Sequence, residues 1–350
     1  RLPGPWASAL LALSLAVAGV LLILYGSAAL SWQQPFLGFF PLRNLAIDSS
    51  ASLTGGGWPA LDAGLAEGDR LIALDGVDLD ALDPGERRRA FEDVLDARDE
   101  GEVVEATFLL DRATTPEGAT CAPVPDTNGL RRCTLSLALG NLPTGDFTSY
   151  FGVGWITAAV LWLVAVALVL RYPRDAQVRT IALVAAAMTI FLAGRFDTLT
   201  THRYAWVWLV TTSLLGGLLV MFALEFPYRL AGVQRAPAWR FAPLVVALGV
   251  GGAAAGLYLS TDPNLNRASF TLATGALLLG SLILGGIMLW RRTRSASPVV
   301  RNQSTMILIG LLPLAIPLLI AFGWQLATGE ALDNLIVFNR WGSVVYKTDR

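Results

Sequence analysis

Two cysteines and one histidine are the side chains of this sequence best suited to metal or redox chemistry. Cys121 and Cys133 flank a segment rich in proline, asparagine and glycine, and this spacing predicts a disulfide at the base of a long hairpin loop in an oxidising compartment. Two unrelated thiols are the alternative. The single histidine, His202, lies in a different part of the chain, so the three side chains do not make a closed zinc site. We therefore expect no bound metal ion and no other cofactor.

Recognisable catalytic motifs are absent from the sequence as well. One histidine does not supply the His-Glu-x-x-His pair of a metalloprotease. The sequence also lacks a Gly-x-Ser-x-Gly elbow, a phosphate-binding loop and the ATP-binding motif of a kinase. We expect that the chain as given is not an enzyme.

The composition is that of a polytopic membrane protein. Hydrophobic residues make up 54% of the chain and charged residues 15%, against about 45–50% and about 25% in soluble domains. Seven apolar stretches come close to the roughly 20 residues that a membrane-spanning helix needs. They are Trp6 to Ser31, Phe151 to Leu170, Thr180 to Leu199, Tyr204 to Phe226, Phe241 to Leu259, Ser269 to Trp290 and Thr305 to Ala327. The first is longer than the core of a signal peptide, so we expect an uncleaved span.

A polar insert separates the first span from the other six. Residues 33–148 hold 20 acidic residues and 9 arginines, a net charge of −11, whereas the whole chain has a net charge of −1. The short loops on one side of the predicted spans hold ten arginines, and those on the other side hold three. Since arginine-rich loops face the cytoplasm, the insert is expected to be extracytoplasmic. The domains predicted are residues 1–32 (first transmembrane helix), 33–148 (inserted domain), 149–328 (six-helix bundle) and 329–350 (tail).

The most specific motif lies in the insert. Between Pro59 and Leu79 the sequence predicts a short helical turn ending at Gly64, a strand from Arg70 to Leu74, and a hairpin turn at Asp75-Gly76. This run resembles the core of bacterial PDZ domains, with their AGL..GD.I..(D/N)G pattern. The resemblance implies an α+β fold. Further along we expect a helix from Pro84 to Arg98, strands at Phe39 to Ile47, Val103 to Leu110 and Cys133 to Leu139, and a mixed sheet.

The PDZ resemblance implies a peptide-binding groove, in which an extended peptide joins a sheet edge beside a helix and a loop holds its terminal carboxylate. Phe36-Leu37-Gly38-Phe39 resembles that loop, with phenylalanine in place of the first glycine. Pro41 removes one backbone donor from the strand that follows. The same apolar residues equally fit a domain core. The predicted groove residues are Leu37, Gly38, Phe39, Phe40, Phe91 and Leu95.

The order of one span, a PDZ-like domain and further spans is similar to the N-terminal input region of competence-pheromone-receptor-type bacterial sensor histidine kinases. The Phe226-Pro-Tyr-Arg229 sequence resembles an ending common in those regions. The resemblance implies a sensory input module in the bacterial cytoplasmic (inner) membrane, with a histidine kinase domain missing from the C-terminus. The alternative function is a membrane-anchored docking platform for an envelope protease or assembly partner.

The partners expected are a peptide or protein ligand at the inserted domain and the lipid bilayer, with no nucleic acid. The sequence leaves open whether two copies form a homodimer. Lys347 is the only lysine in the chain. The tail, residues 329–350, is therefore expected to be foreign to the rest of the gene or truncated. A genuine exposed tail is the alternative.

Overall fold

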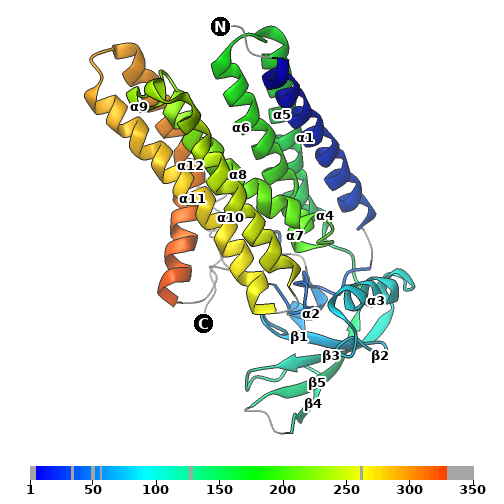
Figure 1. Cartoon of the computed structure of the whole chain (residues 1–350). Helices are drawn as coiled ribbons and strands as arrows, with labels where there is room; N and C mark the ends of the chain where they lie inside the picture. The colour runs from blue at the N-terminus through cyan, green and yellow to red at the C-terminus, as the bar shows by residue number, and fades with distance from the viewer. Residues whose placement is uncertain are drawn as a thin grey trace. The chain divides into compact units, whose positions relative to one another are not determined.

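The fold is known from a computed structural model, which divides the chain into two compact units (Figure 1). The bundle unit comprises the described residues of 1–26, 154–195 and 204–335, and the domain unit those of 27–153 and 196–203. The predicted tail, residues 329–350, lies outside the described residues. The structure describes residues 5–32, 35–48, 52–55, 57–125, 129–260 and 263–328.

Six helices are long and apolar enough to cross a membrane, which confirms a multi-pass helical membrane protein. The seventh predicted span, Thr305 to Ala327, falls in helix α12 (Pro298–Thr328), which is not among the six. A count of seven therefore stays a prediction. The six candidate spans are Ser8–Ser31, Thr144–Arg171, Ala176–Leu199, Ala205–Glu225, Ala238–Leu259 and Ala268–Arg294.

Tryptophans join the first helix to the second in the bundle unit. Trp155 and Trp162 of α5 (Val153–Arg171) donate from their indole nitrogens to carbonyl oxygens of α1 (Pro5–Ser31), at 2.9 and 2.8 Å. A Cβ atom on Gly19 would lie 2.8 Å from the ring of Trp162. The glycine thus gives the indole room to lie flat against α1, as small residues do where membrane helices approach closely.

Glycines also bring α8 (Ala205–Glu225) against α11 (Pro263–Arg294). A Cβ atom on Gly280 of α11 would lie 2.3 Å from the carbonyl oxygen of Gly216 on α8, too close for any side chain. The other helices described in this unit are α6 (Ala176–Ala193), α9 (Ala231–Arg235), the short 3-10 helix η2 (Pro237–Phe241) and α10 (Ala242–Leu259).

The domain unit contains a five-stranded sheet in the order β2-β1-β3-β5-β4. Every pair of neighbouring strands is antiparallel, so the prediction of a mixed sheet is wrong. For β1 with β2 and β4 with β5 the reason is the short connection, because parallel neighbours need a longer crossover. The strands are β1 (Arg70–Leu74), β2 (Val77–Asp78), β3 (Val103–Leu110), β4 (Thr120–Pro123) and β5 (Arg131–Ala138).

Several local predictions match these elements. Strands β1 and β3 have the predicted bounds, and α3 (Pro84–Asp96) begins at the predicted residue. At the hairpin, Asp75 and Gly76 have φ angles of 50° and 82°, the left-handed pair that a tight two-residue turn requires.

The predicted strand from Phe39 to Ile47 does not form. Instead this segment folds back on itself, with isolated bridges joining Pro41 to Ile47 and Ala46 to Arg70. Leu45 adopts a φ of 62°, which turns the chain out of the extended conformation. The proline and this turn together leave only short pieces of backbone that can pair.

Cys121 and Cys133 are opposite each other on β4 and β5 and are joined by a disulfide. Cys133 is fully buried in the core of the domain unit. This core includes Phe108 and Val104 of β3 and Leu135 of β5. The disulfide therefore fixes the outer strand of the sheet to the strand that the core holds.

A buried carboxylate fixes the loop that precedes α2 (Pro59–Asp62). Asp146, of α4 (Thr144–Phe147), is fully buried and accepts five hydrogen bonds of 2.8–2.9 Å from backbone and side-chain donors. A buried carboxylate needs this many donors because no water replaces them. The donors belong to Ser52, Leu53, Thr54 and Trp58.

Candidate functional site

A cavity of about 70 Å³ lies in the domain unit, beside helix α3. Four of the six predicted groove residues line it: Leu37, Phe39, Phe91 and Leu95. All four also belong to the core of the domain, so they support the fold and present part of their surface to the cavity. This volume is well below the about 300 Å³ at which pockets for drug-sized molecules begin. It suits one side chain of a larger ligand.

Gly38 and Phe40, the other two predicted residues, do not line this cavity. Gly38 has a φ of 93°, and a Cβ atom there would lie 2.4 Å from the backbone nitrogens of Pro59 and Ala60. It therefore lets the loop pack against α2. Phe40 is fully buried among other rings, at centroid distances of 5.2–6.1 Å. These rings are Trp32, Phe36, Trp58, Tyr150 and Phe196.

The loop next to the cavity has unused backbone donors. Phe36 pairs with Gly140 through two hydrogen bonds, and the carbonyl oxygen of Leu37 accepts from Ala60. Across the described part of the chain, however, the amides of residues 37–40 donate to no acceptor. Buried backbone amides without a partner are rare in folded proteins. Two of these amides belong to cavity-lining residues, Leu37 and Phe39, and an anionic ligand group in the cavity would satisfy such donors.

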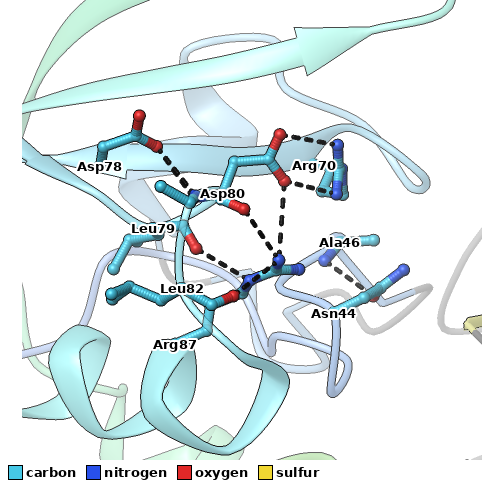
Figure 2. A network of polar contacts seen from close by, with 9 residues as sticks. Asn44, Ala46, Arg70, Asp78, Leu79, Asp80, Leu82 and Arg87 are labelled. Atoms are coloured by element: carbon cyan, nitrogen blue, oxygen red, sulfur yellow. Dashed lines mark hydrogen bonds and ion pairs between the residues drawn. The ribbon is translucent and has the colours of Figure 1, made fainter. Parts of the chain in front are cut away.

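Helix α3 is held in place by a polar network at its first turns (Figure 2). The guanidinium of Arg87 donates to the carbonyl oxygen of Leu79 at 2.9 Å and to those of Asp80 and Leu82 at 3.2 Å. The carboxylate of Asp80 in turn pairs with Arg70 of β1 at 2.9 Å. These contacts tie α3 to the sheet, and they fix the wall of the cavity that Phe91 and Leu95 provide.

The same helix brings carboxylates to the cavity. Glu92 and Asp96 lie one turn apart on α3, and both line the cavity. Glu92 pairs with Arg88 at 3.1 Å. Partial burial, followed by the negative charges of Glu92 and Asp93, raises the pKa of the Asp96 carboxyl. Such a carboxyl favours a cationic group nearby, because a positive charge offsets this repulsion.

The third wall of the cavity belongs to the segment from Phe196 to Arg203, which comprises most of α7 (Arg195–Leu199) and the turn before α8. Thr201 and Arg203 line the cavity. Arg88 donates from Nη2 to the carbonyl oxygen of Thr200. The ring of His202 bonds through Nε2 to the carbonyl oxygen of Pro41 at 3.0 Å. This segment, which we call the inter-span segment, therefore belongs to the domain unit although it connects two predicted spans.

Asp197 closes the turn of the inter-span segment. Its carboxylate accepts from the backbone amide of Arg203 at 3.1 Å and from the hydroxyl of Thr201. On sequence alone, His202 is considered only as a possible metal ligand and neither Asp197 nor Arg203 is singled out, so their place beside the groove is missed. The available signal was a mostly polar run from Asp197 to Arg203, interrupted only by Leu199, between two apolar spans.

Nothing in the described part of the chain brings three histidine, cysteine, aspartate or glutamate side chains together as a metal site. The site is a small cavity flanked by the unpaired amides of Leu37 and Phe39, the carboxylates of Glu92 and Asp96, and the inter-span segment. Comparisons with protein-family models, with curated proteins and with solved structures find no match for this chain.

Proposed function

We propose that this chain is a membrane-embedded sensory input module, whose PDZ-like inserted domain binds the end of a peptide ligand. The observation that carries the proposal is the meeting of the cavity, the unpaired amides of residues 37–40 and the inter-span segment in one unit. A ligand in the cavity touches the domain and the inter-span segment together.

The chemistry of the site favours a particular kind of peptide end. The unpaired amides of Leu37 and Phe39 suit a terminal carboxylate, and the cavity admits one apolar side chain. The carboxylates of Glu92 and Asp96 suit a basic residue near that end. The net charge of −11 on residues 33–148 also attracts basic peptides over a longer range.

Coupling to the membrane follows from the chain connection. The candidate span Ala176–Leu199 includes the first residues of the inter-span segment, and the next span begins at Ala205. A ligand that moves Thr201 or Arg203 therefore acts on residues joined directly to two spans. A docking platform, the alternative function, needs no such movement.

The proposed location of the chain is the bacterial cytoplasmic membrane, with the inserted domain, residues 33–148, on the outer side. The ten-to-three distribution of arginines supports it. The disulfide between Cys121 and Cys133 supports it independently, because such bonds persist in oxidising compartments.

The test uses the full chain in nanodiscs, because the inter-span segment is part of the site. A display library of peptides with free C-termini is screened, and the affinity of the enriched peptides is measured by fluorescence polarisation. Amidation of the C-terminus should weaken binding by about tenfold or more, since it removes a charged acceptor. Asp96→Asn should weaken binding of basic peptides severalfold, whereas Asp93→Asn, on the same helix but outside the cavity lining, should not.

Hydrogen exchange separates the two functions. A sensory module predicts that bound peptide changes exchange beyond the cavity lining, in the spans α6 and α8 that the inter-span segment joins. A docking platform predicts protection only of the lining itself, Thr201 and Arg203 included. A folded chain, with its disulfide intact, that enriches no peptide contradicts both.

A further inference from the structure

Arg291, near the end of α11 in the bundle unit, is fully buried. Its Nη1 donates to the carbonyl oxygen of Phe226, and its guanidinium carbon lies 4.7 Å from the ring centroid of Tyr228. Its Nε and Nη2 have no hydrogen-bond partner among the described residues. These two nitrogens form one edge of the planar guanidinium group, the edge that binds two oxygens of a carboxylate or phosphate side by side.

A buried cation with two unused donors is costly, so a compensating group is expected. No ion pair joins Arg291 to a carboxylate of the described chain. The nearby carboxylate, Glu225, is already engaged by Arg240 at 3.0 Å, by the hydroxyl of Thr180 at 3.0 Å and by Arg229 at 3.9 Å. The described residues therefore supply no acceptor to this edge of Arg291, and an anion from another molecule would supply one.

The surroundings of Arg291 are strongly basic. Arg240 has a buried Nε that also lacks a partner in the described part of the chain, and Arg229 is about half exposed. The connections at this end of the bundle, residues 171–179, 225–240 and 291–301, contain ten arginines and two acidic residues. Figure 1 shows α9 and the turn between α11 and α12 at this same end. Basic sites at the ends of membrane helices are suited to lipid headgroups.

We propose that this end of the bundle holds a phosphate-bearing anion, bound by the Nε–Nη2 edge of Arg291, with Arg240 and Arg229 contributing positive charge. A membrane phospholipid with a net negative headgroup and a free phosphate ion offer the same chemistry. The proposal does not depend on peptide binding by the inserted domain.

The test measures thermal unfolding of the purified full chain in detergent. Phosphatidylglycerol is compared with phosphatidylcholine, and sodium phosphate with sodium chloride at equal ionic strength. An anion bound at Arg291 should raise the melting temperature by about 2–4 °C or more at saturation. A response to phosphatidylglycerol alone assigns the lipid as the source, and a response to phosphate assigns the free ion.

Variants then locate the site. Arg291→Met removes the buried charge, so the melting temperature without anion should be maintained while the anion response is lost. Arg291→Lys keeps the charge but not the paired donors, and its affinity for the anion should fall by about tenfold. Arg292→Gln is the matched control, because Arg292 is the next residue and is exposed. Its response should equal that of the unmodified chain.

Three results would overturn the proposal. One is an unmodified chain whose melting temperature no anion changes. The second is an anion response that persists in Arg291→Met. The third is a loss of the anion response in Arg292→Gln as large as that in Arg291→Met, which would show general attraction of anions to the basic surface.

Discussion

The Nε2 atom of His202 lies 3.0 Å from the carbonyl oxygen of Pro41, and this hydrogen bond connects the inter-span segment to the loop beside the groove. Since a carbonyl oxygen only accepts, the proton of the neutral ring is on Nε2. Burial, and next the positive charge of Arg88, lowers the pKa of His202 to about 3. Arg43 acts in the same direction. The ring is therefore neutral at neutral pH.

The first prediction is a dependence of stability on pH. Between about pH 6.5 and pH 3 the unfolded chain binds a proton at His202 that the folded chain does not, so the free energy of unfolding falls as the pH falls through this window. Above pH 6.5 His202 contributes no slope. Thermal unfolding is measured at pH 7.5 and at pH 5.5. The fall in melting temperature between the two should be larger for the unmodified chain than for His202→Gln. Equal losses in the two proteins would contradict the prediction.

Arg88→Gln tests the attachment of the inter-span segment. This change removes the donor to the carbonyl oxygen of Thr200 and the ion-pair partner of Glu92. The expected cost is about 1–3 kcal/mol, because a buried acceptor loses its donor. Hydrogen exchange at residues 196–203 should accelerate. Arg89→Gln makes the same change of charge on an exposed neighbour and should stay within about 0.5 kcal/mol. Similar effects of the two changes would show that Arg88 acts only through its charge.

The sequence was informative where structure is set locally. The alternation of Val103 to Leu110 reproduces β3, and the Asp75-Gly76 pair reproduces the hairpin, because side-chain period and turn chemistry are encoded within a few residues. Six of the predicted spans lie on helices that are long and apolar enough to cross a membrane, for the same reason, since length and apolarity decide them.

The sequence was not informative where distant parts meet. The contact between His202 and Pro41 joins residues 161 positions apart, and no local sequence pattern predicts it. The segment from Phe39 to Ile47 looked extended, but the turn at Leu45 depends on its surroundings in the domain. The unpaired amides of Leu37 to Phe40 likewise appear only once their neighbours are placed.

Asp146 is expected to be among the most sensitive positions of the domain unit. Asp146→Asn replaces one carboxylate oxygen with an amide nitrogen, which cannot accept a hydrogen bond. Either the donors to Oδ1, the amides of residues 53 and 54 and the hydroxyl of Thr54, or the donors to Oδ2, Ser52 and Trp58, then lose their acceptor. A loss of about 2–4 kcal/mol is expected, because buried donors are left unpaired. Chemical unfolding monitored by tryptophan fluorescence measures it. Asp111→Asn, at an exposed position, is the control and should have little effect. A loss of unfolding free energy no greater than that of Asp111→Asn would show that Asp146 does not hold this loop in place.

Gly280→Ala tests the close approach of α8 and α11. The added Cβ atom would lie 2.3 Å from the carbonyl oxygen of Gly216, and because that contact is with backbone, the two helices must separate. Overpacking of this kind costs about 1–3 kcal/mol. The melting temperature in detergent should therefore fall. Gly286→Ala is the matched control on the same helix, since a Cβ atom there meets no described atom within 4 Å. It should be neutral or slightly stabilising, because alanine favours helix more than glycine does. Equal melting temperatures for the two variants would mean that α8 and α11 are farther apart than this contact requires.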